Sequence, residues 1–107
     1  MKLRVNDEAQ ANYDYIDGWW RENRDKDPGL FRDEVDRVIA LLPSSPEMGI
    51  KYCDIAGITV RRVLLKKTRH YLYYWLDGDA YVIEVVSIWG TPLEDEPQLE
   101  DKPPFSS

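Results

Sequence analysis

The chain has 107 residues, a formal net charge of -6 and 43% hydrophobic residues, among them four Trp and seven Tyr. This length and apolar content predict one compact domain and exclude a chain that is disordered throughout. No apolar run approaches the roughly 18–20 residues of a membrane span, and no signal-peptide stretch occurs at the N-terminus, so we expect a cytoplasmic protein. One Cys and one His exclude a disulfide framework and the common zinc sites, so we expect no metal and no cofactor.

The net charge changes sign along the chain. Residues 1–50 carry seven Lys and Arg against eleven acidic residues, and residues 51–75 carry six against one. Residues 76–107 carry one Lys against eight acidic residues. The acidic total disfavours direct binding to nucleic acid, whereas the basic middle segment is a surface suited to an acidic partner.

Residues 1–6 alternate between apolar and polar side chains, which predicts a short first strand. Asn6 or Asp7 can cap the helix that follows, in which apolar residues recur at spacings of 4, 3 and 4. We expect this helix to fade within the charged stretch 21–27.

A second helix is predicted to start at Asp27 and Pro28, because an N-cap residue followed by Pro is a helix-start signal, and to end at Pro43. Three segments rich in β-branched and aromatic residues then predict strands, namely 58–65, 71–76 and 81–89, with a hairpin turn at 77–79. The predicted fold class is α+β, with an N-terminal strand and a two-helix hairpin packed on a small antiparallel β-sheet. We divide the chain into a folded domain over 1–90 and an acidic, Pro-rich C-terminal extension over 91–107.

The basic residues of the middle segment are the first candidates for a binding site. They lie on one predicted strand and the turn after it: Arg61, Arg62, Lys66, Lys67 and Arg69. Since adjacent strand residues point to opposite faces, Arg61 and Arg62 cannot both serve one surface. The cluster fits a face that binds RNA, DNA or an acidic protein, and equally a solvated strand whose charges prevent edge pairing.

The tryptophans are the second candidates. Only one of the adjacent Trp19 and Trp20 can point fully into the core, so the other is available to a partner, and Trp89 ends the last predicted strand. We expect His70 to be a polar turn residue rather than a general base, and Cys53 to be a small, partly buried hydrophobe. The sequence holds no Gly-rich phosphate loop, nucleophile elbow or metal motif, so we expect no catalytic residue.

Three features together resemble the RelE/ParE superfamily of bacterial type II toxin–antitoxin toxins. They are the order of a strand, two helices and a meander, the segment GITVRRVLL at 57–65 that leads into HYLYY at 70–74, and the last strand VIEVVSIWG at 82–90. The loop from Pro46 to Gly49 also fits. The resemblance covers about residues 1–90 and implies a RelE/ParE-like toxin domain there.

The resemblance implies one of two activities. RelE-like members cut messenger RNA on the ribosome with basic residues and often a tyrosine near the C-terminus, whereas ParE-like members inhibit DNA gyrase by binding. Both kinds are silenced by an antitoxin whose C-terminal segment wraps the toxin. The resemblance therefore implies a hetero-oligomer with a cognate antitoxin.

The residue types favour the ParE-like branch. Ribonuclease members generally place Arg or Lys just after the last strand, where residues 91–96 carry three acids and no positive charge. In addition, Tyr71 stands where ribonuclease members often have Arg, and Leu64 is apolar where another base is expected. We therefore expect a toxin that acts by protein binding and inhibits DNA gyrase.

Two alternatives remain open. One is a ribosome-dependent mRNA endoribonuclease that uses Arg62, Lys66 and Lys67. The other is a non-toxic relative that only binds an antitoxin. It stays open because Trp89 and Gly90 match a ParE-like C-terminal pattern whose Arg is missing here.

Overall fold

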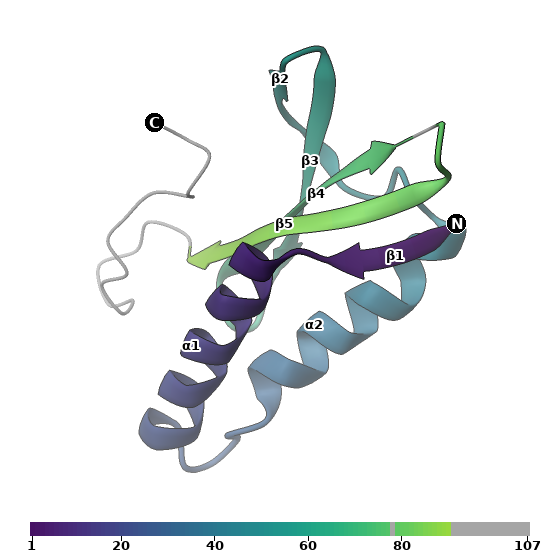
Figure 1. Ribbon diagram of the computed structural model, residues 1–107. Helices are drawn as coiled ribbons and strands as arrows, with labels where there is room; N and C mark the ends of the chain where they lie inside the picture. The colour runs from purple at the N-terminus through teal and green to yellow at the C-terminus, as the bar shows by residue number, and fades with distance from the viewer. Residues whose placement is uncertain (78, 91–107) are drawn as a thin grey trace.

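The computed structural model describes residues 1–77 and 79–90 of the chain. Its elements are β1 (Lys2–Val5), α1 (Asp7–Asn23), α2 (Leu30–Leu41), a 3₁₀ turn (Leu42–Ser44), β2 (Ile50–Ile55), β3 (Ile58–Leu65), β4 (His70–Asp77) and β5 (Val82–Gly90). The strands form one five-stranded sheet in the order β1-β5-β4-β3-β2. Both helices lie on one side of this sheet, and the β2–β3 hairpin projects away from them (Figure 1). The predicted extension over 91–107 and the middle residue of the predicted turn at 77–79 lie outside the described residues.

The structure confirms the predicted α+β class and corrects it in two places. The sheet is mixed rather than wholly antiparallel, because β1 pairs in parallel with β5. The strand β2 was not predicted at all. It pairs antiparallel with β3 through a tight turn in which Ala56 and Gly57 have φ of 51° and 81°. Its residues alternate poorly between buried and exposed, so the period-two signal of a half-buried strand is weak there.

The first helix begins as predicted and the second does not. The Asn6 side chain accepts a hydrogen bond from the Ala9 backbone N–H at 2.8 Å, which caps α1. The start of α2 was predicted at Asp27, but the helix begins three residues later, at Leu30. The Leu30 N–H donates to the Asp27 carbonyl at 3.2 Å, so this segment forms a turn, and Gly29 holds the N-cap position without a side-chain cap.

The main core lies between the helix pair and one face of the sheet. It is built from apolar residues of both helices and of the strands β4 and β5, including Ile16, Phe31, Val35, Leu72, Tyr74, Ile83, Val85 and Ile88. A polar contact fixes α1 on this face, since the Asn12 side-chain oxygen accepts from the Ile88 backbone N–H at 3.1 Å and from the Ser87 hydroxyl at 3.2 Å. The second face of the sheet carries no helix (Figure 1). We call it the open face.

A buried tyrosine anchors the loop that leads into β2. The Tyr74 hydroxyl donates to the Pro46 carbonyl at 2.8 Å and accepts from the Gly49 N–H at 2.9 Å. Arg61 adds a third contact, because its guanidinium donates to the Gly49 carbonyl at 2.7 Å. A Cβ atom on Gly49 would lie 2.9 Å from the Tyr74 ring and 2.8 Å from the Arg62 carbonyl oxygen, so only glycine fits there.

His70 is the clearest correction to the sequence analysis, which expected a polar turn residue. It is fully buried as the first residue of β4, with its ring edge-on to Phe31 at a centroid distance of 5.3 Å. The expectation was wrong because the pleat of β4 points this side chain toward α2. Burial lowers the pKa of His70 from 6.5 to about 4, and the nearby Thr68 backbone and the charge of Glu34 offset only part of that effect.

We expect Gly49→Ala to lower the free energy of unfolding by about 1–3 kcal/mol, because the added methyl group must displace the Arg62 backbone or the Tyr74 ring. Gly18→Ala is the matched control. Position 18 lies in α1 with open space around it, so alanine should leave stability unchanged or raise it by up to about 1 kcal/mol. Urea unfolding of both variants measures this. Equal stability of the two variants would contradict the claim that close contacts with Tyr74 and the Arg62 backbone require glycine at position 49.

We expect the protein to lose about 3 kcal/mol of stability between pH 7 and pH 4 through His70 alone. The unfolded chain takes up a proton near pH 6.5, whereas the folded chain resists protonation down to about pH 4, so acid favours unfolding. Urea unfolding of the wild type and of His70→Leu across this range provides the measurement. The difference in stability between the two proteins should change by that amount, and a difference independent of pH would refute this assignment.

Candidate functional site

A cation stacked among tyrosines is the most distinctive feature of the open face. The Arg62 guanidinium carbon lies 4.0 Å from the ring centroid of Tyr71 and 4.8 Å from that of Tyr52. Tyr73 completes the group, 5.0 Å from Tyr52 and 6.1 Å from Tyr71 between ring centroids. We call these four residues the Arg62 cluster. Such stacking holds a guanidinium in one orientation while its donor groups stay able to bind an anion.

The strand pairing explains why this cluster forms. Arg62 is the Cα partner of Tyr73 on the neighbouring strand β4, and Tyr71 lies two residues before Tyr73 on the same face. Tyr52 comes from β2, on the other side of β3, and a bulge in β2 follows Lys51. Sequence analysis missed Tyr52 because it missed its strand. The only local signal was the turn residue Gly57 before the predicted strand 58–65, which is compatible with a hairpin partner on its N-terminal side.

The protonation of Tyr73 limits what the cluster can do chemically. Burial raises the pKa of Tyr73 above 10.0, and its hydrogen bond to Arg62 only partly opposes this. The phenol therefore stays protonated at neutral pH, where it can donate a hydrogen bond but cannot take up a proton. The cluster is suited to holding a negatively charged group rather than to general-base chemistry.

The structure separates the two adjacent arginines, as the sequence predicted. Arg61 points to the helix side, where it binds the Gly49 carbonyl in the loop that leads into β2, whereas Arg62 lies on the open face. Arg61 is thus engaged in holding a loop. Of the two, only Arg62 belongs to the open-face cluster.

The other basic candidates lie in the turn between β3 and β4. Lys66, Lys67 and Arg69 are all exposed there, and we call these three residues the basic turn. Lys66 lies four positions after Arg62, which corresponds to about 13 Å between Cα atoms along an extended strand. The Arg62 cluster and the basic turn are therefore two distinct groups of residues, one on the open face and one beyond the end of β3.

A buried carboxylate on α2 holds the basic turn in place. Glu34 accepts from the Lys67 N–H at 2.9 Å, from the Thr68 N–H at 3.0 Å and from the Thr68 hydroxyl at 2.7 Å. Arg69 has φ of 65°, a left-handed conformation that costs a non-glycine residue about 1 kcal/mol. Sequence analysis gave Glu34 no role, because its partners lie more than thirty residues away along the chain.

The tryptophans occupy three different environments. Trp20 is in the core and Trp19 is half-buried, as expected for adjacent helical residues, and the Arg24 guanidinium lies 5.0 Å and 5.3 Å from the ring centroids of Trp19 and Trp20. Trp89 packs half-buried on the open face beside Tyr71, its Cα partner on β4. Trp89 therefore extends the Arg62 cluster, whereas Trp19 lies on the helix side.

A groove of about 240 Å³ runs between the two helices. It is lined mainly by apolar side chains, and we define the helix groove by Val5, Gln10, Tyr13, Val35, Asp36, Ile39, Val85 and Ile88.

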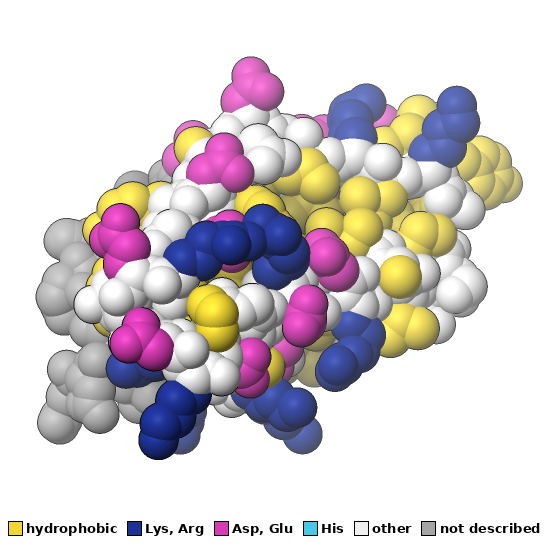
Figure 2. Space-filling view, turned by 90° about the horizontal axis from the view of Figure 1, so that it is seen from below, with side chains coloured by type: hydrophobic (Ala, Val, Ile, Leu, Met, Phe, Trp, Pro, Cys, Tyr) yellow, Lys and Arg dark blue, Asp and Glu magenta, His cyan; other side chains and the backbone are white. Residues whose placement is uncertain are grey.

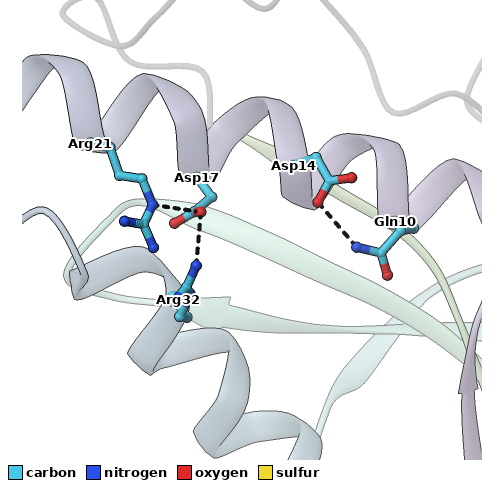
Figure 3. Close-up of polar contacts among 5 residues, drawn as sticks. All are labelled: Gln10, Asp14, Asp17, Arg21 and Arg32. Carbon is cyan, nitrogen blue, oxygen red and sulfur yellow. Dashed lines mark hydrogen bonds and ion pairs between the residues drawn. The ribbon is translucent and has the colours of Figure 1, made fainter.

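Near the helix groove, Asp17 of α1 accepts from Arg21 at 2.9 Å and from Arg32 of α2 at 3.3 Å, which ties the helices together (Figure 3). Figure 2 views the helix side, where side chains of both charges surround exposed hydrophobic ones.

The described residues were also compared with the requirements of a metal site and of a membrane-spanning helix. Within residues 1–77 and 79–90, no three His, Cys, Asp or Glu side chains are placed to hold a metal ion together. Neither α1 nor α2 has the length and apolar content that a membrane-spanning helix needs.

Comparison with known proteins identifies the fold. The chain is similar to a solved structure described as the chromosomal ParDE TA system from P. aeruginosa, with 18% identity and a TM-score of 0.66 over 85% of this chain and 96% of that one. It is also similar to a YoeB/ParE toxin from Agrobacterium tumefaciens, with 19% identity and a TM-score of 0.54 over 85% of this chain and 99% of that one. No family model and no curated protein matches the sequence. These likenesses confirm the predicted RelE/ParE toxin fold.

We expect Glu34→Ala to lower the free energy of unfolding by about 1–3 kcal/mol, because it leaves donors of the turn without an acceptor. Amide hydrogen exchange at Lys67 and Thr68 should accelerate beyond the change that global destabilisation explains. Asp33→Ala removes the neighbouring exposed acid and should change stability by no more than about 0.5 kcal/mol. Unchanged exchange at Lys67 and Thr68 in Glu34→Ala would show that the carboxylate does not hold the turn.

Proposed function

Since the chain has the RelE/ParE toxin fold, we propose that it is the toxin of a type II toxin–antitoxin system. In this proposal it belongs to the ParE-like branch, acts in the cytoplasm by binding DNA gyrase, and is neutralised by a cognate antitoxin. The toxin domain spans residues 1–90. The Arg62 cluster is the observation that carries the proposal, because it is built to bind and lacks a group able to accept a proton.

The chemistry of RNA cleavage explains why the cluster favours binding. A metal-independent ribonuclease needs one group to take the proton of the 2′-hydroxyl and another to stabilise the charge on the phosphate. Arg62 could meet the second need, but the side chains that surround it are phenols, and the pKa of Tyr73 is raised. His70 is enclosed in the core on the opposite face. This arrangement supports a binding toxin over the ribonuclease alternative.

The helix side offers the surface that we assign to the antitoxin. The helix groove has a mainly apolar lining and a volume of about 240 Å³, which suits apolar side chains on one face of an amphipathic segment. The half-buried Trp19 supplies an aromatic anchor on the same side. The basic turn supplies positive charge for acidic residues of the same segment. We assign the open face, with Arg62 and Trp89, to the target.

We expect induction of the chain alone to arrest bacterial growth, and co-expression of the reading frame beside its gene to restore growth. In the arrested cells plasmid supercoiling should fall while translated messages stay intact, because a gyrase inhibitor leaves RNA uncut. Supercoiling gels and primer extension measure the two effects. Cleavage of translated messages would establish the ribonuclease alternative, and normal growth on induction would establish the non-toxic relative.

We expect Arg62→Leu to abolish the arrest, because it removes the oriented cation of the open face. Arg4→Leu is the matched control. Arg4 lies on the same face and pairs with Glu84 at 2.8 Å, so its loss should leave toxicity unchanged. Circular dichroism and thermal melting of purified Arg62→Leu check that it folds. If the Arg62→Leu protein is folded and still arrests growth, the Arg62 cluster does not bind the target.

A further inference from the structure

We infer that the acidic C-terminal segment, residues 91–107, docks on the basic turn of its own chain. The strand pairing supplies the first observation. The described chain ends with β5 at Gly90, whose Cα partner is His70, the residue that follows the basic turn. Antiparallel partners lie about 5 Å apart between Cα atoms. The last described residue, Gly90, therefore lies beside the end of the basic turn.

The charges of the two parts are complementary. Residues 91–107 contain five acidic residues and one Lys, whereas the basic turn presents three exposed cations. Glu34 accepts hydrogen bonds from the turn backbone and the Thr68 hydroxyl, and the ion pairs among the described residues lie on other elements. The three exposed cations of the basic turn therefore stay open to an additional anionic partner.

The acidic residues are also within reach. Glu94 follows Gly90 by four residues, and an extended chain spans about 3.3 Å per residue, so its carboxylate can lie anywhere within about 13 Å of the sheet end. Asp95 and Glu96 follow directly. A tether this short produces an effective concentration in the millimolar range, which favours contact within one chain over contact between chains.

The receiving surface is rigid and has a place for an apolar side chain. The bonds to Glu34 fix the turn, and Arg69 keeps its left-handed conformation despite the cost. A hollow of about 210 Å³ adjoins the turn between α2 and β3, lined in part by Arg37, Val38 and Leu64. Leu64 is 42% exposed there. Leu99 of the C-terminal segment can occupy this hollow while the acids pair with the turn.

The contact is expected to be weak and sensitive to salt. Each exposed ion pair contributes no more than about 1 kcal/mol, so the docking depends on several pairs acting together. At about 0.5 M salt the charges are screened within a few ångströms, and the contact should open. The segment would then compete with any acidic partner for the basic turn. This inference concerns the chain alone and holds whatever the target or antitoxin proves to be.

Paramagnetic relaxation in the full-length protein tests the inference. A nitroxide is attached at Gln98→Cys in a Cys53→Ser background, and the amide signals of ¹⁵N-labelled protein are compared before and after reduction of the nitroxide. We expect the signals of Lys66, Lys67 and Arg69 to weaken at least twofold. Those of Ala56 and Gly57, at the opposite end of β3, should not change. If Cys53→Ser perturbs the fold, Cys53→Ala replaces it.

Charge variants supply the matched controls. The triple change Glu94→Gln, Asp95→Asn and Glu96→Gln should restore the signals of the basic turn to within about 20% of their intensity in the reduced sample, as should about 0.5 M salt. The double change Lys2→Gln and Lys51→Gln removes two exposed cations outside the turn and should leave the weakening in place.

Three outcomes would overturn the inference. The first is the absence of weakening at the basic turn. The second is weakening that persists in the triple variant, which would show that the carboxylates do not cause it. The third is equal weakening when spin-labelled protein without ¹⁵N is mixed with ¹⁵N protein without the label, because the segment would then dock on a second copy.

Discussion

The alternation of side chains along β3 and β4 governs the rest of this structure. Arg61 and Arg62 are adjacent and therefore point to opposite faces of the sheet. Arg61 binds the Gly49 carbonyl in the loop before β2, and Arg62 lies in the Arg62 cluster on the open face. Tyr73 and Tyr74 are divided in the same way, because Tyr73 lies in the Arg62 cluster on the open face and Tyr74 lies in the main core. A shift of register by one residue would place Arg62 against the helices and Tyr74 in solvent. Packing of the helices on a single face is what forbids that shift.

Hydrogen bonds from two buried side chains hold the loops at the ends of the sheet strands in place. Glu34 and Tyr74 lie in the interior or at its border, yet their polar atoms bind loop backbone rather than each other. Burying a carboxylate or a phenol is unfavourable unless donors and acceptors surround it, and here the loops provide them. These bonds tie the loop before β2 and the basic turn to the body of the domain. The surface residues on them are therefore held in place before any partner arrives, which lowers the entropy lost on binding.

The fold and the function rest on different kinds of evidence. At 18% and 19% identity the two solved structures share the backbone architecture of this chain, and most side chains differ. A shared fold can serve unrelated activities, so the functional argument must come from the site. Here it comes from a guanidinium stacked between the rings of Tyr52 and Tyr71 on the open face, beside Tyr73, whose pKa is raised by burial. That geometry is suited to binding an anionic group.

The sequence by itself determined the features that depend on neighbours along the chain. The apolar spacing in 9–20 and 31–42 predicted both helices, Asn6 predicted the cap of α1, and three of the five strands in the sheet were assigned from their composition. The opposite directions of Arg61 and Arg62 followed from period two alone. Each of these depends on residues fewer than five positions apart, so a local pattern is enough.

Only the tertiary structure decided the features that depend on distant partners. Tyr52 became part of the site through a strand recognisable by its pairing with β3. Glu34 and His70 became buried through contacts of α2 with the basic turn and with β4, respectively. The parallel pairing of β1 with β5 joins residues eighty positions apart. A lone His before a strand has the same sequence signal whether it faces water or core. What separates the two cases is the helix packed over it, and no local pattern in the sequence records that contact.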